Sequence, residues 1–171
     1  MPMRLLEHEA KVLLRKIGFP VPASRLVSTP EEASQAALLL GFPVALKAQV
    51  PTGGRMKAGA IRFASSAEEA HQAARDVLSR EVGGHRARAV LVEKQAQVSR
   101  ECYLGATYDT SAKLPLALFS LLGGVDIEEV AQAHPEKVAR IHYSALLPSM
   151  DYPFKEGLAS GRVTGRDLPT L

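Results

Sequence analysis

The stretch Lys47-Ala-Gln-Val-Pro-Thr-Gly-Gly-Arg-Met-Lys57-Ala-Gly59 is the most informative part of this sequence. It places three cations and three glycines within thirteen residues, directly after an apolar run that is typical of a strand. Glycine has no Cβ, so backbone N–H groups approach an anion closely, and lysine and arginine then neutralise its charge. The composition of this stretch therefore suits a polyphosphate, such as the triphosphate of a nucleotide.

Simpler explanations exist for parts of the same stretch. On a strand, Lys47 can be a solvated lysine at a sheet edge, and the glycine-rich segment can be a flexible turn whose charges keep it soluble. Two common phosphate-binding motifs, Gly-x-x-x-x-Gly-Lys-Ser/Thr and Gly-x-Gly-x-x-Gly, are absent. Because Lys47 directly precedes a basic glycine-rich segment, we favour phosphate binding. Arg55 would bind phosphate oxygens bidentately, and Lys57 would act as a point charge.

Length and composition exclude several classes of protein. The 171 residues suffice to bury a core in one domain or two small ones, and the contents of 46% hydrophobic and 23% charged residues are ordinary for a globular protein. A net charge of +3, spread among acidic residues, gives little support for nucleic-acid binding. No apolar run approaches the ~20 residues that span a bilayer, and the N-terminus lacks the apolar core of a signal peptide.

The cysteine content indicates a reducing compartment, and the histidine spacing gives no sign of a zinc site in the protein. The single cysteine, Cys102, cannot form an intramolecular disulfide, which favours a cytoplasmic location. We expect Cys102 to be a small buried hydrophobic residue on a strand. The five histidines stand far apart, and none has a spacing typical of a zinc ligand.

Upstream of the basic stretch, the residue pattern predicts two helices and two strands. Apolar positions at helical spacing predict a helix over residues 4–17. A second helix starts after Thr29, which caps its first turn, and Glu32 completes the capping box; we expect this helix to end at Gly41. The expected strands on this side cover residues 24–28 and 44–50.

Downstream, the same signals predict a loop over residues 51–59 and a helix that opens at Ser66, with Glu69 in the capping box, and ends near Arg80. Gly83-Gly84 then breaks the chain. The other expected elements are strands over residues 60–64, 88–94, 100–108, 114–121 and 138–144 and a short helix over residues 126–133.

Helices and strands alternate at first, and hairpin-like strands follow. This order predicts an α+β fold with mixed sheets and flanking helices in two small lobes. We expect one domain over residues 1–150. The tail over residues 151–171 is richer in glycine, proline and charge, so the sequence leaves its order open.

Three acidic or glycine-rich positions are further candidates for a binding site. Glu93 ends the strand over residues 88–94; it either lies in solvent or accepts hydrogen bonds from the ribose hydroxyls or the adenine amino group of a nucleotide. Glu101, at the start of the next strand, would order the phosphate-binding lysine or act near metal-bound phosphates. The segment Gly123-Gly-Val-Asp-Ile-Glu-Glu129 is either a backbone anion nest or a plain turn before an acidic helix start.

Taken together, these segments resemble the N-terminal, ATP-grasp portion of the succinyl-CoA synthetase β subunit family. Each segment alone is a weak signal, but six in the same order over about 120 residues are specific, and beyond residue 150 the resemblance fades. The matching segments are Leu6-Glu-His-Glu-Ala-Lys11 with Gly18-Phe-Pro-Val-Pro22, Lys47-Ala-Gln-Val50, Gly53-Gly-Arg-Met-Lys-Ala-Gly59, Val90-Leu-Val-Glu93, Arg100-Glu-Cys-Tyr-Leu-Gly105 and Gly123-Gly-Val-Asp-Ile-Glu128.

The resemblance implies an ATP-grasp fold and ATP- or GTP-dependent ligation of an acid to coenzyme A. In that family a phosphoryl group passes from the nucleotide to a histidine on a partner α subunit, then to the acid, and coenzyme A displaces it. The resemblance assigns no catalytic residue to this chain. The positions that it assigns to nucleotide binding are Lys47, Gly54, Arg55, Met56, Glu93 and Glu101.

Two departures from the family pattern bear on these expectations. Met56 stands where the family usually has glycine, and Pro51-Thr52 stand where it has His-Ala, so a changed substrate or weaker nucleotide binding is possible. The family requires Mg²⁺, but its asparagine and aspartate ligands lie downstream of every matching segment, so we expect no metal site in this chain. The CoA-ligase domain of the family also lies downstream of every matching segment, so we do not expect it in this chain.

The sequence therefore leaves several interpretations open. The preferred one is the nucleotide-binding piece of a succinyl-CoA-synthetase-like ligase, as a shortened piece, a split subunit or a truncated paralogue that is incomplete as an enzyme alone. A second replaces succinate by malate, citrate or acetate. A third is a noncatalytic module that keeps the fold in order to assemble with an α-like subunit.

Overall fold

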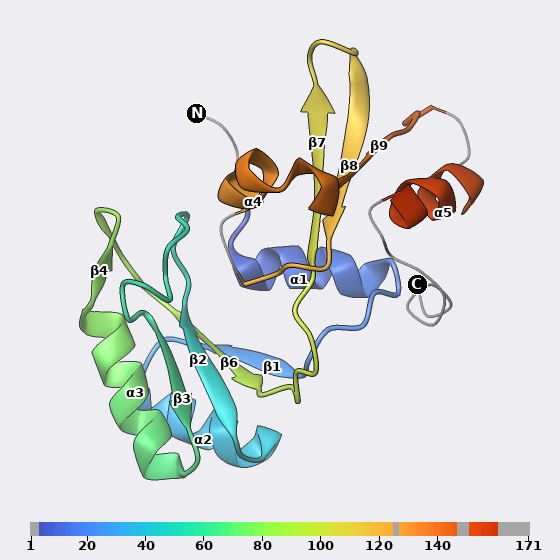
Figure 1. Ribbon diagram of the computed structural model, residues 1–171. Helices are drawn as coiled ribbons and strands as arrows, with labels where there is room; N and C mark the ends of the chain where they lie inside the picture. The colour runs from blue at the N-terminus through green and yellow to red at the C-terminus, as the bar shows by residue number, and fades with distance from the viewer. Residues whose placement is uncertain (1–3, 125–126, 147–150, 161–171) are drawn as a thin grey trace. The chain divides into compact units, whose positions relative to one another are not determined.

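The computed structural model describes residues 4–124, 127–146 and 151–160, which form two compact units (Figure 1). The first unit ends at Gln97 and the second begins at Val98. Both contain helices and antiparallel sheets, so the predicted α+β class with two lobes is confirmed.

The first unit is built on a four-stranded sheet. Its strands lie in the order β1 (Ser24–Val27), β6 (Val90–Lys94), β2 (Val44–Ala48), β3 (Ile61–Ala64). We expected mixed sheets, but every strand pair among the described residues is antiparallel. The reason is the insertion of β6 between β1 and β2, which keeps these two parallel strands from pairing with each other. The strand β2 is therefore an interior strand.

Two helices cover one face of this sheet, α2 (Pro30–Leu40) and α3 (Ala67–Ser79) (Figure 1). Both begin where the sequence predicted, because Thr29 Oγ1 accepts a hydrogen bond from the Glu32 N–H at 3.2 Å and Ser66 Oγ accepts one from the Glu69 N–H at 3.1 Å. The buried helical residues are small, which allows close packing between the helices: Ala33, Ala36, Ala37, Ala70, Ala73, Ala74 and Val77.

The alternation of side chains along β2 and β6 separates an apolar face from a polar one. Val44, Leu46 and Val92 belong to the apolar core beneath the two helices, where a fully buried leucine such as Leu46 contributes about 1.5–3 kcal/mol. Lys47 and Glu93 point to the opposite face, because each lies one residue away from a core position.

Three further elements complete the first unit. The helix α1 (Glu7–Lys16) has no buried residue, although the sequence pattern predicted an apolar stripe. The strands β4 (Glu81–Val82) and β5 (His85–Arg86) form a small hairpin at Gly83-Gly84, where the sequence predicted only a break. Both glycines have positive φ angles, +55° and +77°, which suits a tight turn between two short strands.

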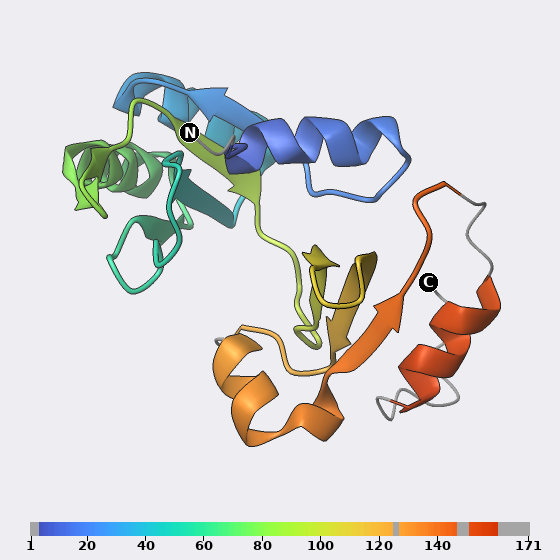
Figure 2. The same ribbon diagram turned by 90° about the horizontal axis from the view of Figure 1, so that it is seen from above.

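The second unit contains a three-stranded antiparallel sheet, β7 (Tyr103–Asp109), β8 (Leu114–Ser120) and β9 (Ala139–His142). The helix α5 (Asp151–Ser160) packs beside β9 (Figure 2), where Ile141 and Leu158 form a small core. This helix lies in the tail whose order the sequence left open. The domain boundary at residue 150 stays a prediction. The unit also contains α4 (Ile127–Ala133) and the short 3₁₀ helix η1 (Pro135–Lys137).

Two predictions concern residues of the second unit. Cys102 was expected to be buried on a strand, which is wrong: Cys102 is exposed, and β7 begins one residue later at Tyr103. The proposed nest in the segment from Gly123 to Glu129 includes Val125 and Asp126, which lie outside the described residues.

None of the helices in the described part of the chain is long and apolar enough to cross a membrane.

Candidate functional site

The polar face of the first sheet carries a buried ion pair. Lys47 on β2 donates a hydrogen bond to Glu93 on β6, with 2.7 Å between Nζ and Oε1. Glu93 is only 5% exposed, so the alternative of a solvated carboxylate at the strand end is wrong. The alternative of a solvated lysine at a sheet edge is wrong as well, because β2 is an interior strand.

Helix α1 covers this pair with two more charged side chains. The Lys11 ammonium lies 3.0 Å from Glu7 Oε1 and also donates a hydrogen bond to Glu93 Oε2. The Lys47 ammonium lies 3.1 Å from the same Glu7 oxygen. Two lysines and two glutamates therefore form a closed ring that joins α1, β2 and β6.

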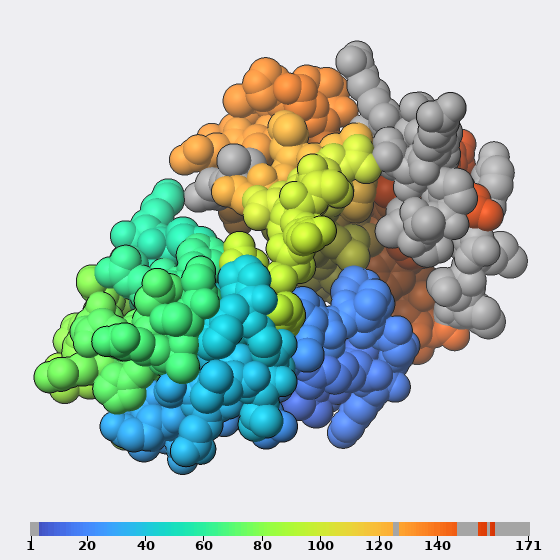
Figure 3. Space-filling model, turned by 90° about the horizontal axis from the view of Figure 1, so that it is seen from below, coloured from blue at the N-terminus to red at the C-terminus, as the bar shows by residue number. Residues whose placement is uncertain are grey.

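Hydrogen bonds through Gln49 also connect α1 to β2 beside the ring. The His8 N–H donates to Gln49 Oε1 at 3.0 Å, and the Gln49 amide donates to the Lys47 carbonyl, again at 3.0 Å. Figure 3 shows the blue surface of α1 beside the cyan segment that contains β2. Because α1 has no buried residue, these hydrogen bonds and ion pairs are its main attachment to the sheet.

The glycine-rich loop folds as a compact turn that places Arg55 next to the ring. Gly54 has a φ of +72°, a conformation that favours glycine. Hydrogen bonds from the Ala58 N–H to the Gly54 carbonyl at 3.0 Å and from the Ala60 N–H to the Arg55 carbonyl at 2.8 Å close the turn. Arg55 Nη1 donates to the Ala48 carbonyl at 3.0 Å and forms an ion pair with Glu7 Oε2 at 2.8 Å.

The same loop leaves several hydrogen-bond donors available. Among the described residues, no partner accepts a hydrogen bond from the backbone N–H groups between Gly53 and Lys57. Met56 and Lys57 are exposed. Successive N–H groups beside an arginine are suited to binding an anion.

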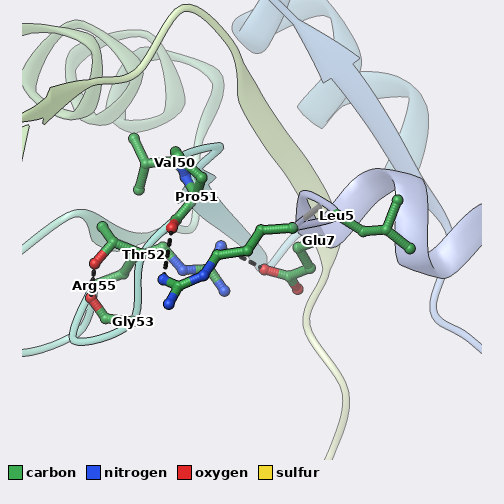
Figure 4. Close-up of a pocket in the computed structure, with 8 residues that line it drawn as sticks. Leu5, Glu7, Val50, Pro51, Thr52, Gly53 and Arg55 are labelled. Atoms are coloured by element: carbon green, nitrogen blue, oxygen red, sulfur yellow. Dashed lines mark hydrogen bonds and ion pairs between the residues drawn. The ribbon is translucent and has the colours of Figure 1, made fainter. Parts of the chain in front are cut away.

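A cavity of about 360 Å³ lies where the loop faces the start of α1 (Figure 4). In Figure 4 the Glu7 carboxylate points toward Arg55, and the Pro51 carbonyl accepts a hydrogen bond from Arg4 at 3.3 Å. The residues that line this cavity come from the start of the chain and from the loop: Arg4, Leu5, Glu7, Val50, Pro51, Thr52, Gly53 and Arg55.

The electrostatics of the cluster shift the pKa values of Glu7 and Lys47 in the direction that keeps both groups charged. Burial alone would raise the pKa of Glu7, but the charge of Lys47 and the hydrogen bond from Lys11 outweigh it and lower the pKa to about 2. Burial would lower the pKa of Lys47, but the hydrogen bond to Glu93 and the charges of both glutamates raise it. Three cations against two carboxylates leave a net charge of +1, which favours an additional anion.

The structure thus brings together three of the six predicted site residues, Lys47, Arg55 and Glu93. Gly54 and Met56 flank Arg55 in the loop. Glu101 belongs to the second unit, where its carbonyl accepts a hydrogen bond from the Gly123 N–H at 3.0 Å. Their contacts with a nucleotide stay predictions.

Glu101 lies close to the turn formed by the two glycines that follow β8. A Cβ at Gly124 would overlap the Glu101 carboxylate, and a Cβ at Gly123 would lie 2.7 Å from the backbone of Glu101 and Cys102. The backbone leaves no room for a side chain at Gly123, and the φ of +70° at Gly124 favours glycine, so this pair belongs to the packing around Glu101.

Glu7 and Lys11 were not among the predicted site residues. Their four-residue spacing on a helix was a signal, but it is also the spacing of an ordinary surface ion pair. A metal site is a different matter: within the described residues, no three histidine, cysteine, aspartate or glutamate side chains gather in a way that could hold an ion.

Comparison with known proteins identifies the family of this chain. A family model described as an ATP-grasp domain matches residues 4–166. The chain is 47% identical to the β subunit of succinate–CoA ligase [ADP-forming] from Rubrobacter xylanophilus over 154 residues, 90% of this chain and 40% of the relative. It is 41% identical to β subunit 1 from Archaeoglobus fulgidus over 169 residues, 99% of this chain and 44% of the relative.

A similar fold occurs in a solved structure, the dinucleotide forming acetyl-coenzyme A synthetase 1 from Ca. Korarchaeum cryptofilum in complex with coenzyme A, Ca-AMPCP and HgCl⁺. The TM-score is 0.73 and the identity 28%, over 94% of this chain and 69% of the other.

The chain spans less than half the length of the two ligase β subunits, 40% and 44%. The resemblance to their N-terminal region is nevertheless confirmed over most of this chain. Because the family match runs from residue 4 to residue 166, the chain belongs to the ATP-grasp domain family.

Proposed function

We propose that this chain is the nucleotide-binding part of an acid–CoA ligase of the succinyl-CoA synthetase type. The observation that carries the proposal is the convergence of Lys47 and Arg55 beside a loop with available N–H groups, in a cluster of net positive charge. The similarity to the β subunits of succinate–CoA ligases supports the reaction class.

The side chains have donors left for the phosphates. A lysine ammonium has three N–H donors, and Lys47 directs two of them to Glu7 and Glu93. Arg55 uses Nη1 for the protein, and its Nε and Nη2 make no hydrogen bond with a described residue. Together with the N–H groups of the loop, these donors would stabilise the charge that develops on the phosphates during phosphoryl transfer, for which ATP supplies the phosphoryl group.

The two predicted carboxylates, Glu93 and Glu101, have different roles in this proposal. Both oxygens of Glu93 accept hydrogen bonds from lysines, so we assign to Glu93 the orientation of Lys47. Its predicted contact with the ribose or the adenine stays a prediction, as does the contact of Glu101 with metal-bound phosphates.

We assign the partner and the substrates by analogy with the similar ligase subunits. The partner in this proposal is an α-type, CoA-binding subunit that carries the phosphohistidine. The words "ADP-forming" in the names of the similar subunits favour ATP over GTP, and the acid is succinate. Acetate is the first alternative, because the similar solved structure is an acetyl-coenzyme A synthetase; malate and citrate follow.

A Mg²⁺ ion held by side chains does not fit the described residues. They contain no cluster of three suitable ligands, and both Glu7 and Glu93 are already bound by cations. No step of the proposal therefore relies on a protein-held metal ion.

Alanine at Lys47 or at Arg55 is expected to weaken ATP binding about tenfold or more, because each removes charge-assisted hydrogen bonds to the phosphates. Isothermal titration of the 171-residue chain measures the affinity. Arg25→Ala is the matched control. Arg25 is an exposed cation on β1 and pairs with Val92, so it lies on the helix-covered side of the sheet, away from the ion cluster. Removal of the Arg25 side chain should therefore leave ATP binding unchanged. Unchanged ATP affinity in both Lys47→Ala and Arg55→Ala would refute the assigned roles.

Mixing the chain with an α-type, CoA-binding subunit is expected to give a complex that co-elutes in size-exclusion chromatography. ATP should raise the Tm of that complex, since a ligand that binds only the folded state stabilises it. Co-elution without an ATP-dependent rise in Tm would identify a noncatalytic assembly module instead. Absence of any complex would contradict the proposed partner.

A further inference from the structure

One carboxylate of the first unit contacts three cations at once. Glu7 Oε1 lies 3.0 Å from Lys11 Nζ and 3.1 Å from Lys47 Nζ, while Oε2 lies 2.8 Å from Arg55 Nη1. The Glu7 side chain is 18% exposed. It is thus the common partner of both cations that the proposed function assigns to the phosphates.

The backbone fixes the place of this carboxylate. Glu7 is in the first turn of α1, where the helix dipole favours a negative charge. The next residue, His8, is tied to β2 through Gln49, and Arg4 just before the helix is tied to the Pro51 carbonyl. Contacts on both sides of Glu7 therefore hold the start of α1 against the sheet and the loop.

Glu7 has a different importance for each of its two phosphate-binding partners. Lys47 is also held by Glu93, so it keeps one carboxylate when Glu7 is removed. Arg55 has no second carboxylate among the described residues; only the Ala48 carbonyl remains. The orientation of the guanidinium, with Nη1 turned to the protein and the other donors left over, depends on Glu7.

We propose that Glu7 is a positioning residue of the polyphosphate site, which holds the Lys47 ammonium and the Arg55 guanidinium in the arrangement that binds the phosphates without contacting the nucleotide itself. The inference rests on the proposed function, because it assumes that these two cations bind a nucleotide. If it is correct, removal of the Glu7 carboxylate weakens nucleotide binding only through the contacts that Lys47 and Arg55 make with the phosphates. The loss of affinity should then grow with the number of phosphates in the ligand.

The pH dependence of stability provides a separate prediction for the same carboxylate. The charged groups that face Glu7 are Lys11, Lys47 and Arg55, with Glu93 beyond the two lysines. The pKa of Glu7 is lowered in the folded protein from 4.5 to about 2, so its contribution to stability is complete above pH 4.5 and is lost as the pH falls toward 2. Urea denaturation should show that the stability advantage of the wild type over Glu7→Gln shrinks across this range. An advantage that stays constant from neutral pH to pH 2 would contradict the ion-pair role.

The direct test titrates ATP, ADP and AMP into the wild type, Glu7→Gln and the matched control Glu9→Gln. Glu9 lies in the same first turn, but its carboxylate accepts a hydrogen bond from the Leu6 N–H at 2.7 Å, and glutamine can replace it there. We expect Glu7→Gln to weaken ATP binding about tenfold, ADP binding less and AMP binding less than about twofold, since hydrogen bonds to charged groups have this magnitude. Glu9→Gln should bind all three like the wild type, and Glu7→Asp should restore part of the ATP affinity.

Each other outcome is decisive. ATP affinity that is unchanged or increased in Glu7→Gln overturns the inference, as does an equal loss for ATP and AMP, which would indicate a general structural defect. If Lys47→Ala and Arg55→Ala weaken ATP binding while Glu7→Gln does not, the proposed function stands and only the inference fails. If the wild type and all variants bind ATP equally or not at all, both fail.

Discussion

Two carboxylates shared among three cations are the constraint on which the first unit depends. Glu7 on α1 and Glu93 on β6 both bind Lys11 and Lys47, and Glu7 also binds Arg55 of the glycine-rich loop. Because α1 has no buried residue, these charges, with a few hydrogen bonds, attach the helix to the sheet. Removal of one partner would leave a poorly hydrated charge without compensation, which costs far more than the loss of a surface ion pair.

The rest of the first unit explains how such a cluster can exist beside an ordinary core. The alanines of α2 and α3 pack closely on one face of the sheet, so that β2 and β6 bury Val44, Leu46 and Val92 there. The opposite face is then available for Lys47 and Glu93, one residue out of phase. The proposed nucleotide site on this face would use the rigidity of interior strands for its lysine and the freedom of a glycine-rich loop for its arginine.

Local signals in the sequence predicted much of this fold, and nonlocal contacts account for the remainder. Thr29 and Ser66 could be identified as helix caps because each bonds an N–H only three residues away. The contact of Lys11 with Glu93 joins residues that are 82 positions apart, so no local sequence pattern predicts it. For Glu93 the sequence left open whether the carboxylate lies in solvent or in a site, and its contact with Lys11 comes from the nonlocal docking of α1.

A crystal structure of the chain with a nonhydrolysable ATP analogue is the most direct test of the proposed site. We expect phosphate oxygens within about 3 Å of Lys47 Nζ and of the Arg55 guanidinium, with Glu7 still in contact with both side chains. An analogue bound with its phosphates away from these two cations would contradict it.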